Sequence, residues 1–332
     1  MTGEPTVEAA PGAEALASRL EPHRRELTAY AYRMLGSAFE AEDAVQETLL
    51  RAWRGFEGFE GRAALRSWLY RIATNVCLDM LRGRSRRALP IDLGPARTAD
   101  APLGEALPEV TWLEPVPDAR VLPTDGDPAA LAEARETVRL AFVAALQHLP
   151  ARQRAVLILR DVLAWRAAEA AELLDTSVAS VNSALQRARA SLGEHGDGAA
   201  DARPQALDDR ERDLLGRYLD AFERYDMDAF TALLREDASW TMPPYPLWLR
   251  GHDDIRRWCL GPGSACRGSR LVATAANGQP AFGQYKPAPD GGHRPWALQV
   301  LEVSDGRVDG VSFFLDTARW FPLFGLPDRL EA

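Results

Sequence analysis

The sequence is nearly without lysine, poor in cysteine and free of long apolar runs. Lys286 is the only lysine among 39 basic residues. The three cysteines, Cys77, Cys259 and Cys266, are too few and too scattered for a disulfide framework or a metal site, so we expect no metal and no cofactor. No segment approaches the roughly 20 apolar residues that span a bilayer, and the first residues lack an export signal. These absences predict a cytoplasmic protein without membrane association.

A net positive charge is missing as well. The 39 basic and 48 acidic residues give a net charge of −9, which by itself argues against nucleic-acid binding. The charge is unevenly distributed, however. Residues 19–88 carry 13 arginines against 9 acidic residues, a balance of +4, whereas residues 89–130 carry 2 against 8, a balance of −6. Nucleic acid therefore remains a candidate partner of the first helical segment.

The first third of the chain has helical periodicity. Gly36 ends one helix, and Ser37 with Glu40 forms an S-x-x-E capping box for the next. A third helix is expected from about Leu65 to Leu81. One face of the second helix consists of Ala44, Val45, Thr48, Leu49, Ala52 and Trp53, and the polar residues Asp43, Gln46, Glu47 and Arg51 lie elsewhere.

Residues 89–130 are predicted to form an extended acidic linker, because they lack periodicity and positions 90–128 contain eight prolines. Within this linker, Trp112 and Leu113 are costly to leave in water. We predict that this pair docks on a folded domain, and the alternative is a chance apolar pair in a tail.

Helical spacing returns after the linker and then gives way to strands. One long helix ends at Pro150, and Arg166–Leu174 and Ser177–Ala190 have the spacing of a helix-turn-helix. A helix over about Arg210–Arg235 follows. Four strands are expected at Ala238–Met242, Leu271–Ala275, Trp296–Val303 and Arg307–Phe314, with Asp305-Gly306 as a hairpin turn. Helices followed by an antiparallel sheet predict an α+β domain.

Several motifs resemble known families. The motifs that resemble region two of the extracytoplasmic-function (ECF) sigma factors of the sigma-70 family are Leu49–Trp53, Phe59–Arg62 and Ser67–Asn75. Region four is similar to Leu149–Arg154, Leu159–Val162 and Ser180–Arg189. The SnoaL-like domain fused to a subset of these factors is similar to Asp208–Leu330, through Arg217-Tyr218, Ala221–Glu223, Glu236–Ala238, Met242–Pro244, Asn277–Ala281 and Phe324–Pro327.

The resemblance implies a multidomain chain: two all-α sigma domains, of which the second contains the helix-turn-helix, and a cone-shaped α+β SnoaL-like domain. The expected partners are core RNA polymerase and promoter DNA, together with an intramolecular contact between the SnoaL-like domain, the linker and the sigma domains. The expected boundaries are a disordered tail 1–18, region two 19–88, the linker 89–130, region four 131–194, a second linker 195–207 and the SnoaL-like domain 208–332.

In region two, the resemblance implies two surfaces. The polymerase-docking positions match Asp43, Gln46, Glu47 and Arg51, which read alone are a plain solvated helix face. The positions that capture a flipped base of the minus-ten element match Phe59, Arg62, Ser67 and Asn75. Trp68 is expected in the core rather than on a base. Phosphate contacts are expected from the dense arginine cluster, Arg82, Arg84, Arg86 and Arg87.

In region four, the groove-facing positions match Ser180, Asn182, Ser183, Ala184, Gln186 and Arg187, and we expect Val178, Val181 and Leu185 in the core. Many relatives carry arginine where Asn182 and Ala184 stand. Since asparagine and glutamine favour adenine edges, we predict a minus-thirty-five element read with fewer guanine contacts. Arg152 and Arg160 are phosphate candidates, with exposed structural charge as the alternative.

In the last domain, the resemblance implies an apolar pocket inside the cone. Its predicted lining, which is alternatively plain core, is Tyr218, Trp240, Met242, Trp248, Trp258, Trp296 and Phe314. Enzymes among the relatives use Asp, His or Tyr there. Asp237, His252, Asp253, Tyr218 and Tyr285 are available, but their spacing fixes no pairing, so we assign no catalytic residue. A small-molecule ligand stays an open alternative.

The leading hypothesis is a sigma factor, not an enzyme, that binds core polymerase, recognises the minus-thirty-five and minus-ten elements and initiates transcription. Its C-terminal domain would be a built-in regulator. The alternative is that the SnoaL-like domain is an isomerase, a hydrolase or a ligand sensor, with DNA binding as a targeting device. A simple helix-turn-helix repressor is disfavoured, because a repressor has no use for region two.

Overall fold

The structure is a computed structural model that describes residues 11–56, 64–195 and 209–331. The chain forms two compact units. One consists of residues 1–84 and 150–189, and the other of residues 85–149 and 190–332. Phe59 and Arg62 lie outside the described residues, as does nearly all of the predicted second linker.

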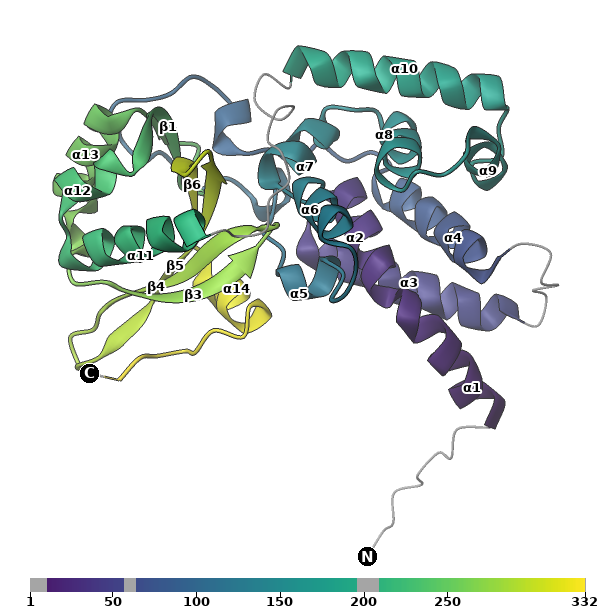
Figure 1. Cartoon of the computed structure of the whole chain (residues 1–332), viewed down its shortest axis with the longest axis horizontal. Coiled ribbons are helices and arrows are strands. Elements are labelled where there is room, and N and C mark those ends of the chain that lie inside the picture. The colour runs from purple at the N-terminus through teal and green to yellow at the C-terminus, as the bar shows by residue number, and fades with distance from the viewer. Residues whose placement is uncertain (1–10, 57–63, 196–208, 332) are drawn as a thin grey trace, which may run out of the picture. The chain divides into compact units, whose positions relative to one another are not determined.

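The first unit is helical (Figure 1). A helix begins at Pro11, inside the segment predicted as a disordered tail. The elements of this unit are α1 (Pro11–Leu20), η1 (Glu21–His23), α2 (Arg24–Leu35), α3 (Ala38–Gly55), α4 (Leu65–Met80), α8 (Ala151–Leu157), the π-helical turn η5 (Ile158–Val162), α9 (Ala167–Leu173) and α10 (Val178–His195).

Local sequence signals fix the helix boundaries in this unit. Gly36 ends α2 with a φ of 69°, and its N–H donates to the Tyr32 carbonyl at 2.8 Å. Ser37 caps α3, since its Oγ accepts from the Glu40 N–H at 3.1 Å. Both predicted boundaries are therefore confirmed.

The second unit contains a six-stranded mixed sheet. Its order is β2-β1-β6-β5-β4-β3, in which β1 and β6 are parallel and the other neighbours antiparallel. The elements of this unit are η3 (Pro90–Asp92), η4 (Glu109–Thr111), α5 (Asp118–Val121), α6 (Pro128–Glu136), α7 (Leu140–Gln147), α11 (Asp209–Arg224), α12 (Met227–Ala232), β1 (Leu234–Thr241), β2 (Trp248–Arg250), α13 (His252–Leu260), η6 (Pro262–Cys266), β3 (Arg270–Ala276), β4 (Gln279–Pro287), β5 (His293–Ser304), β6 (Arg307–Phe314) and α14 (Thr317–Leu323).

The four predicted strands are present, and Ser304 pairs with Arg307 around the predicted hairpin turn. Strands β2 and β4 were not predicted. The helix expected over 210–235 is two helices, because Tyr225 takes a φ of 59° and Asp226 starts a new cap at the Ala229 N–H. An aromatic core fills the space between α11, α12 and the sheet, with Tyr218 and Phe230 fully buried.

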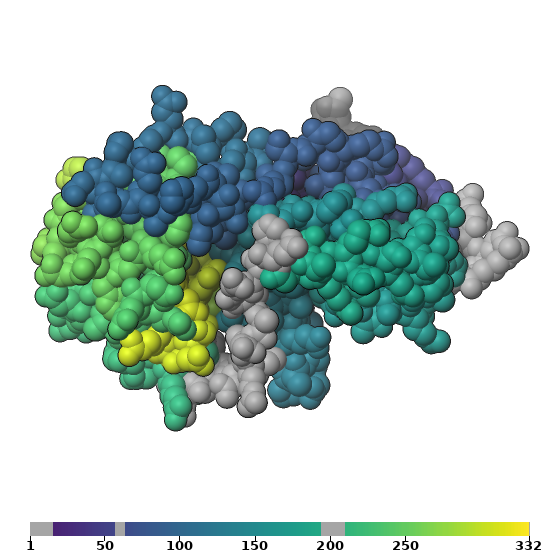
Figure 2. Space-filling model, turned by 90° about the horizontal axis from the view of Figure 1, so that it is seen from above, coloured from purple at the N-terminus to yellow at the C-terminus, as the bar shows by residue number. Residues whose placement is uncertain are grey.

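The acidic linker is folded onto the sheet domain. Figure 2 shows its blue residues lying across the green part of the second unit. Trp112 is 4% exposed and Leu113 is fully buried, which confirms the predicted docking of this pair. The single long helix expected before Pro150 is instead α6 and α7, separated at Thr137–Arg139. Residues 85–149 therefore belong structurally with the C-terminal domain.

Candidate nucleic-acid interface and docked linker

One exposed stripe runs along α3. Asp43 and Gln46 are exposed and Glu47 is half-buried. At the next positions of the same face, Leu50 is 49% exposed and Trp53 is 53% exposed. Trp53, which periodicity places on one face with Ala44 and Ala52, is therefore exposed, whereas those two alanines are buried. Leu50 and Trp53 thus add exposed apolar surface to the polar groups of this face.

Arg51 lies beside this stripe. Its Nε donates to the Glu47 Oε1 at 2.6 Å, one helical turn away. Its guanidinium is also 4.0 Å from the Asp79 carboxylate on α4. Because both partners are substantially exposed, these pairs hold the Arg51 side chain in place and contribute little to stability.

The face of α4 that we assigned to the minus-ten element is accessible in part. Asn75 is exposed and Ser67 is half-buried. Trp68 is half-buried too, with its ring centroid 6.4 Å from that of Phe56, so it is neither a full core residue nor a free platform. Of the two described base-capture candidates, Ser67 and Asn75, only Asn75 is exposed, and its amide offers both a donor and an acceptor.

The arginine cluster divides into exposed and buried members. Arg82 donates to Asp79 at 2.9 Å and Arg84 pairs with Glu40, both on the surface of the first unit. Arg86 is exposed and contacts His148. Arg87, in contrast, is 6% exposed. A buried guanidinium cannot reach a phosphate, so the structure contradicts the expected role of Arg87.

The helix-turn-helix is formed by α9 and α10. Ser177 Oγ accepts from the Ser180 N–H at 3.1 Å and so caps the second helix. Val181 and Leu185 are buried as predicted, whereas Val178 is 43% exposed, which contradicts its predicted core position. The predicted groove-facing residues are exposed, except for the half-buried Ala184: Ser180, Asn182, Ser183, Gln186 and Arg187.

Two arginines form structural contacts within the helix-turn-helix module. Arg160 is half-buried and its Nη1 donates to the Trp165 carbonyl, so its guanidinium is committed to the fold. Arg189 grips the Asp161 carboxylate with two bonds of 2.8 and 2.7 Å. For Arg160 the structural alternative is therefore favoured over a phosphate contact.

Helices α8 and α9 also pack on region-two helices inside the first unit. The buried Arg154 donates through Nη1 to the Met34 carbonyl, and burial lowers its pKa to about 10. Trp165 lies edge-on to Tyr70, with ring centroids 5.2 Å apart. Arg71 Nη2 donates to the Glu172 carbonyl at 2.9 Å. The first helix of the helix-turn-helix is thus held against α4 by apolar and polar contacts.

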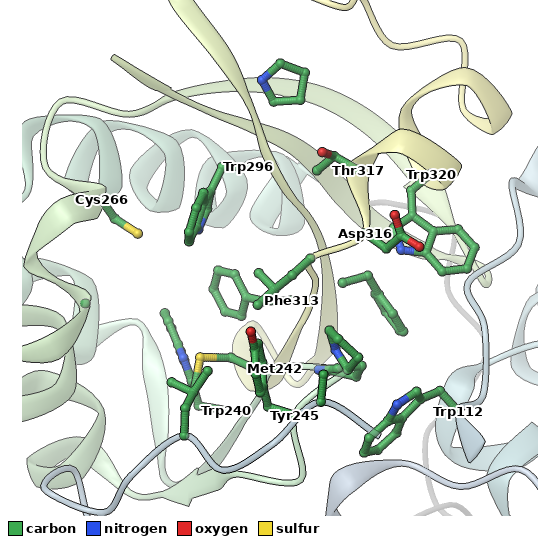
Figure 3. A pocket seen from close by; sticks show the side chains of 18 of the residues that line it. Trp112, Trp240, Met242, Tyr245, Cys266, Trp296, Phe313, Asp316, Thr317 and Trp320 are labelled. Atoms are coloured by element: carbon green, nitrogen blue, oxygen red, sulfur yellow. The ribbon is translucent and has the colours of Figure 1, made fainter. Parts of the chain in front are cut away.

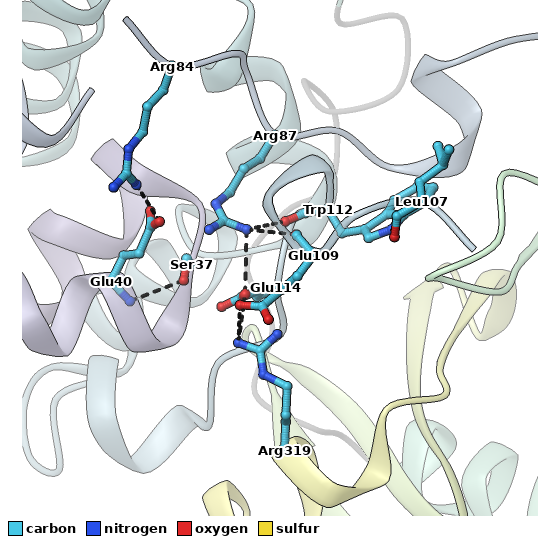
Figure 4. A network of polar contacts seen from close by, with 9 residues as sticks. All are labelled: Ser37, Glu40, Arg84, Arg87, Leu107, Glu109, Trp112, Glu114 and Arg319. Carbon is cyan, nitrogen blue, oxygen red and sulfur yellow. Dashed lines mark hydrogen bonds and ion pairs between the residues drawn. The ribbon is translucent and has the colours of Figure 1, made fainter. Parts of the chain in front are cut away.

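The linker is fastened at its start by the buried Arg87 (Figure 4). Its Nη1 donates to the Trp112 carbonyl at 2.8 Å and lies 3.4 Å from the Glu114 carboxylate. Glu114 is 2% exposed and also accepts from Arg319 at 3.1 Å. Arg319 in turn pairs with Glu109 at 2.8 Å. Two guanidiniums therefore compensate one fully desolvated carboxylate.

A second fastening is the turn between β3 and β4. Asn277 Oδ1 accepts from the Val116 N–H at 3.0 Å, its Nδ2 donates to the Val138 carbonyl at 2.8 Å, and its own N–H donates to the Val116 carbonyl at 3.0 Å. Gly278 donates its N–H to Asp118 Oδ1 at 2.7 Å. Burial raises the pKa of Asp118 to about 6. In three of these four bonds a side chain, of Asn277 or of Asp118, binds a backbone group.

A third fastening runs along the edge strand β2. Trp248 Nε1 donates to the Gly94 carbonyl and its own carbonyl accepts from Arg97, both at 2.8 Å. Further on, Leu107 donates its N–H to the Pro244 carbonyl at 2.9 Å. The linker thus covers the edge of the sheet, which protects otherwise unpaired backbone groups.

A cavity of about 770 Å³ lies in the second unit (Figure 3). Five of the seven predicted lining residues do line it: Trp240, Met242, Trp258, Trp296 and Phe314. Tyr218 and Trp248 are not among its lining residues, because Tyr218 bonds inside the core and Trp248 holds the linker. The wall that the sequence did not predict comes from the linker, including Leu107, Trp112 and Leu113.

Comparison with known proteins assigns three family models to the chain. The family model of Sigma-70 region 2 matches residues 20–87, that of Sigma-70 region 4 matches residues 139–192, and that of the SnoaL-like domain matches residues 215–311. ECF RNA polymerase sigma factor SigG of Mycobacterium tuberculosis is 52% identical over 317 residues, which cover 93% of this chain and 83% of that protein. The chain belongs to the ECF sigma factors.

A second relative of this sigma factor is ECF RNA polymerase sigma factor SigJ of the same organism, 29% identical over 88% of each chain. The crystal structure of SigJ superposes with a TM-score of 0.61 at 25% identity and covers 94% of this chain and all of that chain. The likeness confirms the predicted fold class: two helical sigma domains and an α+β SnoaL-like domain.

The acid–base candidates of this sigma factor are dispersed. Tyr218 donates to Gln299 at 2.7 Å in a buried chain of neutral groups, and Tyr285 donates to the Pro327 carbonyl. Asp237 pairs with surface arginines, and His252 lies 3.1 Å from the Leu234 carbonyl. Neither these four residues nor Asp253 line the cavity. Within the described ranges, no cluster of potential ligands could hold a metal ion, and no helix is long and apolar enough to cross a membrane.

The sequence did not predict which residues hold the linker: it assigned Arg87 to phosphate contacts and Trp248 to the cavity lining. Asn277-Gly278 is an Asn-Gly pair, which is a strong signal for a tight hairpin turn, so the turn itself was detectable. The partners of Asn277, Val116 and Val138, lie 161 and 139 residues away in sequence. No local sequence pattern predicts contacts over such separations. Arg319 likewise carries no signal of its pairing with Glu114.

Proposed function

We propose that this sigma factor is regulated by its own C-terminal domain, which holds the linker and the beginning of region four. The division of region four carries this proposal. Residues 139–149 group with the SnoaL-like domain, while residues 150–189 group with region two. A helix-turn-helix places its reading helix in the groove while its first helix crosses the DNA backbone, so the module has to be free to approach the duplex. Docking of residues 139–149 therefore favours an inactive form, and release of the linker favours promoter recognition.

Two contacts support the regulatory role of this docking. Arg139 Nη2 donates to the Val303 carbonyl at 2.9 Å, and Asn277 binds the Val138 carbonyl beside it. Both contacts fall where α6 ends and α7 begins, at the first residue of region four. The SnoaL-like domain thus binds the chain at the N-terminal boundary of region four.

The α3 stripe is the surface that we propose for core polymerase. Leu50→Ala and Trp53→Ala should each weaken binding to core polymerase by about tenfold, because exposed apolar anchors carry much of the energy of such interfaces. Leu93→Ala is the matched control, since Leu93 is 43% exposed in the linker against 49% for Leu50. Titration of labelled protein with core polymerase measures the effect, and equal losses in all three variants would contradict the assignment.

Promoter recognition is proposed for two surfaces. The minus-ten element would meet Ser67 and Asn75, with Phe59 and Arg62 as further candidates and Arg82, Arg84 and Arg86 as phosphate contacts. The minus-thirty-five element would meet the exposed face of α10, with Ala184 beside it. Since these positions offer one arginine and several small or amide side chains, we expect few guanine contacts.

Asn182→Ala tests the second surface. Loss of an amide that bonds a base edge should relax preference at a single base pair by about tenfold. Arg152→Ala, a change at an exposed phosphate candidate, should instead weaken binding uniformly across sequences. A binding selection from randomised promoters with polymerase holoenzyme separates the two outcomes, and an unchanged base preference for Asn182→Ala would remove that residue from the reading set.

The whole proposal is tested by run-off transcription with core polymerase. The assay compares the full-length protein with Gly278→Ala, the variant that we expect to release the linker. We expect promoter-dependent transcripts from both and more from the released variant. If neither supports a promoter-dependent transcript, the proposed function is wrong. Ligand sensing by the SnoaL-like domain is a second candidate, and the cavity is the observation that favours it. Action in the cytoplasm, where polymerase works, follows from the same proposal.

A further inference from the structure

The cavity is apolar inside and carries at its rim a basic group that has no carboxylate partner among the described residues. Its interior is built from aromatic side chains, and Figure 3 shows Trp240, Phe313 and Trp320 around it. A cavity of about 770 Å³ falls in the range that holds small organic ligands. The lining therefore favours a molecule with a large apolar body.

The only lysine of the protein stands at this rim. Lys286 Nζ lies 3.1 Å from the centroid of the Trp296 ring, and Trp296 is 41% exposed. Partial burial lowers the pKa of Lys286, while the neighbouring Cys266 thiol opposes that shift. Within the part of the chain that the structure describes, no carboxylate forms an ion pair with Lys286.

The other charged groups of the lining either pair with one another or face solvent. Glu109 and Glu114 both pair with Arg319, so two of the acidic groups and the second cation already compensate one another. Asp316 is exposed to solvent at the start of α14. The ammonium of Lys286 is thus the group of this lining that would gain most from an anionic partner.

Part of the cavity wall belongs to the linker. Leu103, Leu107, Trp112 and Leu113 line the cavity together with residues of the SnoaL-like domain. A ligand in this cavity touches both and loses part of its contact area when the linker leaves. By linkage, a ligand that binds the docked form more tightly stabilises that form.

We propose that the cavity binds an amphiphilic organic anion, with its apolar body among the aromatic side chains and its carboxylate on Lys286, and that this ligand keeps the linker docked. The statement about docking rests on the proposed regulatory function, whereas the statement about binding does not. By binding the docked form, the ligand would hold the sigma factor in its inactive form.

Pyrenebutyrate and its uncharged analogue pyrenebutanol are suitable probes, since energy transfer from tryptophan to pyrene reports their binding to the full-length protein. The wild type should bind the acid at least tenfold more tightly than the alcohol. Lys286→Met should abolish this preference for the acid and leave the affinity for the alcohol within about twofold of the wild-type value. Lys286→Arg should retain the preference for the acid. Arg307→Met, which removes an exposed cation outside the cavity, is the control and should change neither affinity.

Amide hydrogen exchange of residues 103–116 tests the coupling to the linker. Saturating pyrenebutyrate should slow exchange there at least tenfold in the wild type, with no such slowing in Lys286→Met at the same concentration. Equal affinity of the wild type for acid and alcohol would overturn the anion site, and binding without slower exchange would overturn the coupling. Neither result depends on transcription, so failure of the proposed sigma function is recognised separately in the run-off assay.

Discussion

Gly278→Ala should release the linker from the SnoaL-like domain. A Cβ on Gly278 would lie 2.7 Å from the Arg135 carbonyl oxygen and 2.9 Å from the Arg135 Cα, which are backbone atoms that cannot rotate away. Helix α6 would have to move, and the three bonds of Asn277 to Val116 and Val138 would be lost with it. At about 1 kcal/mol for each bond, docking should weaken by about 3 kcal/mol, roughly a hundredfold.

The matched control is Gly306→Ala. Gly306 has a φ of 71° against 70° for Gly278 and also occupies a hairpin turn, but nothing lies within 4 Å of the place that a Cβ would take there. The left-handed backbone therefore costs both variants the same, roughly 1–2 kcal/mol, and only Gly278→Ala brings a Cβ against α6. Hydrogen exchange over residues 116–138 measures docking. Equal protection of this segment in the two variants would contradict the role given to the turn.

Glu114→Gln should destabilise the second unit strongly. The variant leaves the guanidinium of Arg87, itself 6% exposed, without its carboxylate. Breaking a buried pair from one side costs about 3–5 kcal/mol. Partial compensation by the Trp112 carbonyl puts the expected loss near 3 kcal/mol, so the Tm of this unit should fall by roughly 6–12 °C.

Glu109→Gln is the control for this pair. Both acids bind Arg319, but the Glu109 side chain is 59% exposed and the Glu114 side chain 2%. An exposed pair is worth about 0–1 kcal/mol, so the control should shift the Tm by only a few degrees. Thermal unfolding of the full-length protein, followed by tryptophan fluorescence, compares the two. Similar shifts would show that burial of Glu114 is not what makes its pairing matter.

The sequence predicted those parts of the fold that local signals determine. Gly36 and Ser37 set a helix boundary, Asp305-Gly306 set a hairpin, and the spacing of Val181 and Leu185 set the buried face of α10. Strand β4 was missed because its sequence, QPAFGQYKP, contains proline, glycine and two glutamines, which are not typical of strands. Burial against its neighbours overrides that local preference.

The errors at the site have a common physical cause, namely partners that are remote in sequence. Arg87 belongs to an arginine cluster by sequence, yet its burial depends on Trp112 and Glu114, which lie 25 and 27 residues further on. The predicted continuous helix before Pro150 is interrupted where Asn277 binds the Val138 carbonyl. Trp53 fits the apolar face of α3 by periodicity, but it lies exposed at the end of that face. Periodicity alone cannot distinguish a core position from a docking position.

The position of the linker-binding turn late in the chain also has a consequence for synthesis. Asn277 is made 139 residues after Val138, whose carbonyl it binds between α6 and α7. At about 5–20 residues per second, a nascent chain spends roughly 7–28 seconds with region two, the linker and the start of region four already made and their binding turn still missing. A nascent chain therefore carries an undocked linker until Asn277 has been made, and the restraint proposed above can begin only after that point.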